Sequence, residues 1–158
     1  VDVRSIRYPG LISYTSLPGG GTTDYAVDIF YKAKLDNSYN CFLSPETELP
    51  MMYMNDAIRA TVELMEAPKD NIKIRSSYNL SGCSFTPKEL ATKIAHKSKG
   101  FEITYTPDFR QEIADSWPKS IDDSQAQKDW GWKSAFDVDK IVDIMLEKVD
   151  EKIYNLKD

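Results

Sequence analysis

The chain has 158 residues, of which 41% are hydrophobic and 28% charged, and these values are typical of one soluble globular domain. No apolar run approaches the roughly 20 residues of a membrane-spanning helix, and Asp2 and Arg4 interrupt the start of any signal peptide. The net charge is −5 with scattered lysines and arginines, which argues against nucleic acid as a partner because phosphate binding needs clustered cations.

Cys41 and Cys83 are the only cysteines, and His96 is the only histidine. A zinc site of four cysteine and histidine ligands therefore cannot form within the chain, and we predict no metal site. Two thiols without a disulfide framework favour a reducing compartment and a structural, half-buried role, although one disulfide stays open.

The first third of the chain predicts a strand, a glycine-rich loop and a helix. Residues 1–8 alternate as a strand that Pro9-Gly10 ends. The loop closes with Gly19-Gly20-Gly21, where backbone can approach a ligand or another chain closely. Thr22 or Thr23 then caps a helix with Asp24 in its first turn. The buried face of that helix is predicted at helical spacing: Ala26, Ile29, Phe30 and Ala33.

The middle of the chain predicts two more strands and a second helix. Residues 40–43 form a short strand before a turn at 44–46, and residues 49–54 form an apolar extended run. Asn55 or Asp56 caps the second helix, which stops before Pro68. Its inward side chains are predicted to be Ile58, Val62 and Met65.

The last part predicts three further helices and two strands. A strand lies within residues 72–80, and Thr86-Pro87-Lys88-Glu89 starts a helix with a capping box that Gly100 stops. Residues 101–105 form a strand and residues 109–116 a short helix. The final helix begins near Asp137, and its apolar stripe is Val138, Ile141, Val142, Met145, Val149 and Ile153.

Strands thus alternate with helices, which predicts an α/β fold. The chain opens directly in an apolar strand with no preceding βαβ unit to pack against it. This feature indicates a segment of a larger protein.

The residues by themselves carry little chemistry. The segment Gly19-Gly20-Gly21 precedes a helix, whose N-terminus suits an anion, but a hinge or tight turn explains it equally simply. His96 lies among lysines near a helix end, where we expect it to be solvated rather than catalytic. The acidic residues Asp122, Asp123 and Asp129 are expected in a solvated loop. Core or interdomain packing is the expected use of Trp117, Trp130 and Trp132, and ligand stacking is secondary.

Several stretches together resemble the threonine 3-dehydrogenases of the extended short-chain dehydrogenase/reductase type, which are related to the NAD-dependent epimerases and dehydratases. They run through nearly the whole chain in the expected order: RSIRYPGLIS at 4–13, PGGGTTDYA at 18–26, LPMMYM at 49–54, SFTPKEL at 84–90, DSWP at 115–118, DDS at 122–124 and KDWGWK at 128–133.

The resemblance implies that residues 1–158 are the C-terminal part of a Rossmann-type fold with its small substrate-binding subdomain. The NAD-binding half, with its glycine fingerprint and catalytic Tyr-x-x-x-Lys pair, is expected outside this sequence. None of the nine tyrosines is followed by a lysine four positions later, so we predict no catalytic residue of that pair within the chain.

The resemblance also implies roles for five residues. Pro9 and Leu11 would contact the nicotinamide end of NAD. Thr22 and Thr23 would bind the carboxylate of the substrate, and Asp24 its ammonium, although helix capping accounts for these three residues as well.

The implied reaction is oxidation of L-threonine to 2-amino-3-oxobutanoate, with tyrosine as base outside this chain. The segment alone is predicted to be inactive, and a homodimer is expected for the full-length protein. Two alternatives stay open: a non-catalytic or decayed binding domain, and part of a nucleotide-sugar epimerase or dehydratase. The cytoplasm is the expected compartment, with the mitochondrial matrix as the alternative.

Overall fold

The computed structural model describes residues 1–150, which form an α/β fold. The strands are β1 Ile6–Arg7, β2 Gly10–Ile12, β3 Ser38–Cys41, β4 Leu49–Tyr53, β5 Tyr78–Asn79, β6 Cys83–Phe85 and β7 Glu102–Tyr105. The helices are α1 Tyr25–Leu35, α2 Met54–Glu66, the 3-10 turn η1 Lys69–Asn71, α3 Pro87–Lys97, α4 Arg110–Asp115, α5 Ser124–Trp130 and α6 Val138–Lys148. The fold class predicted from the alternation of elements is therefore confirmed.

The described strands pair in three small sheets. β1 pairs with β5, β2 with β4 and β3 with β7, and all three pairs are parallel. β6 adds to β4 in antiparallel orientation, with Leu49 opposite Phe85. Parallel strands need a crossover between them, and α2 supplies one of these crossovers, between β1 and β5.

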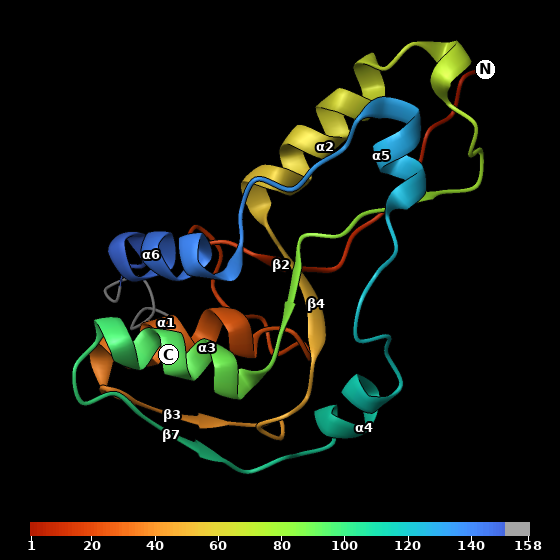
Figure 1. The fold of residues 1–158 in the computed structure, drawn as a ribbon. Helices are drawn as coiled ribbons and strands as arrows, with labels where there is room; N and C mark the ends of the chain where they lie inside the picture. The colour runs from red at the N-terminus through yellow and green to blue at the C-terminus, as the bar shows by residue number, and fades with distance from the viewer. Residues whose placement is uncertain (151–158) are drawn as a thin grey trace.

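The helices form two groups that lie at opposite ends of the β2–β4 pair (Figure 1). In the first group α1, α3 and α6 pack together above β3 and β7, with a core that includes Phe30, Ile94 and Met145. In the second group α2 and α5 pack around Tyr78 and the fully buried Trp132. Because β2 and β4 contribute to both cores, they connect the two groups.

Local signals predicted several elements well. The capping box at the start of α3 is confirmed, since Thr86 accepts from the Glu89 amide and Glu89 accepts from the Thr86 amide. Asp137 caps α6 by accepting from the Lys140 amide. The predicted buried faces of α1 and α6 are confirmed at Ala26, Ile29, Phe30, Ala33, Ile141, Val142, Met145 and Val149, while Ile153 lies outside the described residues.

Other predicted boundaries were wrong. The strand predicted over residues 1–8 is confined to Ile6–Arg7, and the chain re-enters a strand at Gly10 instead of turning away at Pro9-Gly10. The strand predicted within residues 72–80, with its core around 77–80, is confirmed as the short strand Tyr78–Asn79. The sequence reading missed β6 and α5, because a strand of three residues and a short polar helix carry no hydrophobic periodicity.

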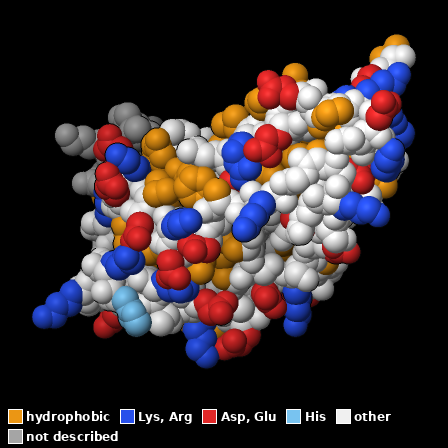
Figure 2. All heavy atoms as spheres, turned by 45° about the horizontal axis from the view of Figure 1, so that its top comes forward, with side chains coloured by type: hydrophobic (Ala, Val, Ile, Leu, Met, Phe, Trp, Pro, Cys, Tyr) orange, Lys and Arg blue, Asp and Glu red, His pale blue; other side chains and the backbone are white. Residues whose placement is uncertain are grey.

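The predicted inward face of α2 is also wrong. Ile58, Val62 and Met65 are 58%, 46% and 71% exposed, and the buried residues include Ala57, Ala60 and Leu64 instead. Alanines on the inner face let the helix backbone approach the sheet closely, so the larger side chains point outward. Figure 2 shows hydrophobic side chains at the surface along the upper edge of the molecule, where α2 lies.

Charged side chains of both signs are interspersed over the face seen in Figure 2. His96 is exposed, as predicted. Within residues 1–150, no helix has the length and apolar character that crossing a bilayer requires.

A buried polar network joins the end of α5 to β5. Asp129 is buried and not in a solvated loop as expected, because its Oδ2 accepts the Tyr78 hydroxyl at 2.6 Å and its Oδ1 accepts the Gln125 amide at 2.7 Å. The Tyr78 oxygen in turn accepts the Lys73 amide at 3.0 Å. Burial opposes ionisation of Asp129, but these hydrogen bonds outweigh it and hold the pKa of Asp129 below its usual value.

Because its pKa is lowered in the folded state, Asp129 should stabilise the protein to an extent that depends on pH. The folded state favours the charged carboxylate. The contribution of Asp129 to the free energy of unfolding is therefore complete above the ordinary aspartate pKa of about 3.9, and it is lost as the pH falls through the lower pKa of the folded state. Asp129→Asn should therefore be less stable than the wild type at pH 6, with the gap narrowing toward pH 3. Urea denaturation at the two pH values measures this, and a gap independent of pH would contradict it.

Candidate functional site

A pocket of about 420 Å³ opens where β2, the start of α1, the start of β4 and the segment after α4 meet. Its lining residues are Tyr8, Pro9, Gly10, Leu11, Thr23, Pro50, Trp117, Pro118 and Ile121. The lining is mostly apolar, with the hydroxyl-bearing Tyr8 and Thr23 as its polar members, and the volume falls in the range of small-molecule sites.

Parallel pairing of β2 with β4 builds the floor of this pocket. Gly10 lies opposite Met51, and Leu11 lies opposite Met52. A Cβ atom at Gly10 would lie 2.5 Å from the Met51 sulfur and 2.7 Å from Cγ2 of Thr23. Glycine is therefore needed at position 10 because Met51 and Thr23 close on its backbone from two sides.

The segment Gly19-Gly20-Gly21, here called the triple-glycine turn, leads into the pocket wall at Thr23. The Asp24 carboxylate oxygen Oδ2 accepts the Gly19 amide at 2.6 Å and the Gly21 amide at 2.8 Å. Gly20 has a φ of +97°, a conformation that side chains rarely adopt. The turn is thus a defined structure held by Asp24.

The structure brings three of the five predicted site residues into the pocket: Pro9, Leu11 and Thr23. Thr22 is buried beside them in the chain, and Asp24 faces the triple-glycine turn. The predicted capping of α1 by Thr22 or Thr23 was wrong. Asp24 is the N-cap residue, its side chain makes no capping hydrogen bond, and a turn closed by the Asp24 amide and the Gly21 carbonyl precedes the helix.

Sequence reading missed the opposite wall of the pocket. Trp117, Pro118 and Ile121 line it, and Trp117 is 42% exposed. A large aromatic ring beside a proline at the end of a short predicted helix is the available signal, but the sequence favours packing for all three tryptophans. That assignment holds for Trp132, which is fully buried, and for Trp130, whose ring meets Tyr78 edge-on at 6.0 Å.

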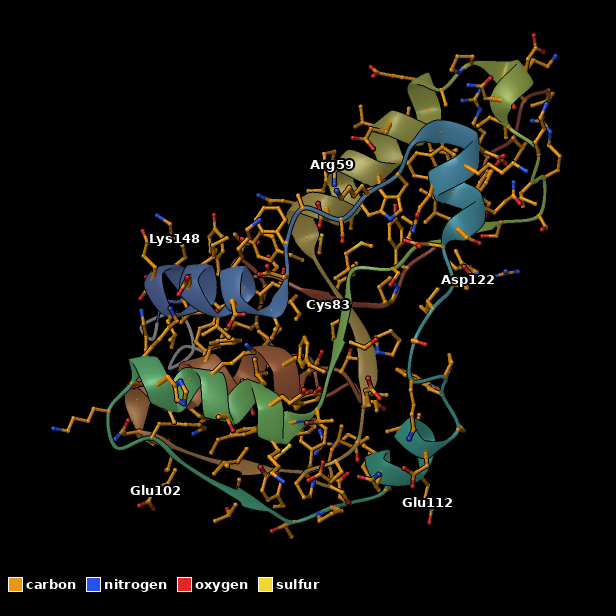
Figure 3. The ribbon with its side chains drawn as sticks, viewed as in Figure 1. Arg59, Cys83, Glu102, Glu112, Asp122 and Lys148 are labelled. Atoms are coloured by element: carbon orange, nitrogen blue, oxygen red, sulfur yellow. The ribbon has the colours of Figure 1, made fainter. Side chains whose placement is uncertain are left out.

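Asp56 does not cap α2 as predicted, since the N-cap residue is Tyr53. Its carboxylate is fully buried and accepts the Ala135 amide at 2.9 Å and the Phe136 amide at 3.2 Å. Arg59, labelled in Figure 3 on α2, pairs with Asp56 at 2.7 Å and donates to the Lys133 carbonyl. Asp56 therefore fastens α2 to the segment between α5 and α6.

The other candidate sites in the described part of the chain have less support than this pocket. An open groove of about 600 Å³ along α3 is larger than the pocket, but its lysines are already paired with carboxylates, as Lys93 is with Asp139 at 2.6 Å and Lys88 with Glu46 at 2.8 Å. No group of three or more His, Cys, Asp or Glu side chains within residues 1–150 is arranged to hold a metal ion. Both cysteines are free thiols; Cys83 is half-buried as predicted, whereas Cys41 is fully buried, and burial raises the pKa of Cys41 to about 11.

Comparison with known proteins gives this pocket a context. No family model matches the chain. Over 147 residues, or 92% of its length, the chain is 52% identical to the mitochondrial L-threonine 3-dehydrogenase of Bos taurus, and it covers 39% of that protein. It is 45% identical over 156 residues to an epimerase/dehydratase of Staphylococcus haemolyticus, of which it covers 49%.

The solved structures agree with the sequence comparison. The GalE-like L-threonine dehydrogenase from Cupriavidus necator, in its apo form, superposes with a TM-score of 0.92 and 57% sequence identity. The match covers 95% of this chain and 54% of that one, so the chain spans about half the length of the relatives it matches. Over nearly its whole length, the chain is thus similar to about half of the length of the GalE-like L-threonine 3-dehydrogenases.

Proposed function

We propose that residues 1–158 form the substrate-binding half of an NAD-dependent L-threonine 3-dehydrogenase whose full length is about twice that of this chain. The observation that carries the proposal is the pocket, which joins the loop at Tyr8–Leu11 to Thr23 and Trp117. These three segments are among those that first pointed to the threonine enzymes, and they are far apart in the sequence. Their convergence on one cavity supports a single site for the reacting groups.

The pocket residues fit one end of NAD. The apolar surroundings of Pro9, Leu11 and Trp117 suit a flat nicotinamide ring, and a volume of about 420 Å³ admits the ring together with a small amino acid. When bound, NAD would accept the hydride from the substrate. The phosphates and adenosine would need the glycine fingerprint, which we expect in the remaining half.

We assign the polar contacts with the substrate to the pocket wall at the start of α1. Thr22 and Thr23 would bind the threonine carboxylate through their hydroxyls and the amides near the start of α1, and Asp24 would attract the ammonium. In the structure the Oδ2 of Asp24 already holds the triple-glycine turn, so we give Asp24 two roles, of which the structural one is visible. Trp117 would cover the substrate and exclude water.

The chain contains no Tyr-x-x-x-Lys sequence, so proton abstraction would depend on residues outside it. The exposed stripe of Ile58, Val62 and Met65 on α2 supports the presence of a further apolar partner surface in the full-length protein. We also propose a homodimer for the full-length protein. The cytoplasm is the expected compartment, and the mitochondrial bovine relative favours the matrix as the alternative.

Two other functions make different predictions. A non-catalytic or decayed domain would bind no L-threonine even when the gene product is complete. A nucleotide-sugar epimerase or dehydratase would be stabilised by UDP-sugars rather than by L-threonine; the name of the staphylococcal relative keeps this alternative open. A thermal-shift panel of NAD, L-threonine and UDP-sugars on the full-length protein separates the three.

The proposal predicts that the full-length protein forms NADH in the presence of L-threonine, and that residues 1–158 alone do not. The physical reason is that residues 1–158 contain the proposed substrate-binding wall of the pocket but lack the proton acceptor and most of the NAD site. Absorbance at the NADH band with equal molar amounts of the two proteins measures this. Threonine-dependent NADH formation by the segment, or its absence with the full-length protein, would overturn the proposal.

A further inference from the structure

The triple-glycine turn is held from two sides. Asp24 binds the amides of Gly19 and Gly21 from within the turn. From outside, Nη1 of Arg110 donates to the Gly20 carbonyl at 3.5 Å, a long hydrogen bond that joins residues 90 positions apart. Since Thr23 in the pocket wall follows two residues after Gly21, any shift of the turn moves this wall.

Arg110 is itself firmly placed. Its guanidinium pairs with Asp108, with Nη2 2.6 Å from Oδ2 and Nε 3.0 Å from Oδ1. The guanidinium carbon lies 3.2 Å from the centroid of the Phe42 ring, and the Arg110 side chain is only 19% exposed. A guanidinium group that is already stacked on a ring and paired with a carboxylate loses little further conformational entropy when it donates one more hydrogen bond.

The helix that carries Arg110 also leads to the opposite pocket wall. Gln111 anchors α4 by accepting the Ser44 amide at 2.7 Å, and the Trp117 amide donates to the Ala114 carbonyl at the end of the helix. One short segment thus carries a contact with the turn at its start and the pocket residue Trp117 at its end. Figure 1 shows α4 set apart from both helix groups, with the segment that carries Trp117 following it.

We infer that Arg110 is a positioning residue that fixes the triple-glycine turn, and with it Thr22 and Thr23, at the spacing from Trp117 that L-threonine binding requires. This inference rests on the proposed function. Arg110 does not line the pocket, so it acts through the turn and not by touching the substrate.

The test compares Arg110→Ala and Arg110→Lys with the wild type in the full-length protein. Loss of this long hydrogen bond predicts a KM for L-threonine that rises roughly two- to fivefold, with kcat and the Kd of NAD changed much less. Lysine keeps the charge but lacks the planar fork and the stacking on Phe42, so it should not restore the KM. Arg75→Ala, which removes an exposed arginine paired with Asp2, is the matched control and should leave all three constants unchanged.

Hydrogen exchange of peptides covering residues 18–24 provides a second readout that needs no turnover. Arg110→Ala should exchange faster there while the rest of the protein is unchanged. Unchanged exchange, or a KM for L-threonine that stays at the wild-type value, would overturn the inference. If the full-length protein does not oxidise L-threonine, the proposed function fails, and the exchange result still decides whether Arg110 fixes the turn.

Discussion

Replacing Asp56 by alanine is expected to lower the free energy of unfolding by about 1–3 kcal/mol, because the part-buried amides of Ala135 and Phe136 both lose their acceptor. The carboxylate is fully buried, so water does not reach it to replace these bonds. The same change removes the partner of Arg59, which bridges α2 to the Lys133 carbonyl. Guanidinium denaturation measures the loss.

Glu63→Ala is the matched control for this prediction. Glu63 also pairs with Arg59, at 2.8 Å, but it is 37% exposed and accepts no buried amide. Its removal should cost no more than about 1 kcal/mol, as for other surface ion pairs. Asp56→Asn should fall between the two because one acceptor oxygen remains. Equal losses for Asp56→Ala and Glu63→Ala would show that the ion pair, not the amide bonds, stabilises this junction.

In the full-length dehydrogenase that we propose, Gly10→Ala is expected to reduce threonine oxidation by up to about a hundredfold, because displacements of about 1 Å at a reacting site have effects of that size. The added methyl group would meet the Met51 sulfur at 2.5 Å and the Thr23 Cβ at 2.9 Å. Thr23 is β-branched and cannot swing aside freely, so the pocket wall itself must move. Overpacking should also lower the unfolding free energy by about 1–3 kcal/mol.

Gly19→Ala introduces the same methyl group at a site with room for it. A Cβ atom there would lie 3.7 Å from the Asp24 carboxylate, which is ordinary contact, and the Gly19 amide would still reach Asp24. Steady-state kinetics and urea denaturation of both variants should show a large loss only for Gly10→Ala. A comparable loss in both, or activity of Gly10→Ala near that of the wild type, would contradict the role given to the β2 floor.

Elements with local signals were the predictable ones. Thr86, Pro87 and Glu89 specify the start of α3 through contacts within four residues, and Asp137 does the same for α6. The inner face of α2 was not predictable, because both the alanine side and the side of Ile58 and Val62 have helical spacing. Which side faces inward depends on what packs against the helix.

In the candidate site, too, some residues were predictable from the sequence and others were not. The family resemblance in the sequence indicated Pro9, Leu11 and Thr23, and the structure brings all three into one pocket. Trp117 and Arg110 were missed as contributors because Trp117 lines the pocket with residues as far away in the sequence as Thr23, and Arg110 reaches the Gly20 carbonyl across 90 positions. No pattern within one segment encodes such a distance.

The sequence by itself determined the α/β class, the family resemblance and the capping of α3 and α6, because these depend on short-range hydrogen bonding, periodicity and residue identity. Only the tertiary structure decided that Asp56 and Asp129 are buried anchors, that α2 exposes its large apolar side chains, and that Trp117 faces Thr23 across a pocket. The physical reason is that burial and long-range hydrogen bonds depend on which elements pack together, and a carboxylate in the sequence reads the same whether water or two backbone amides surround it.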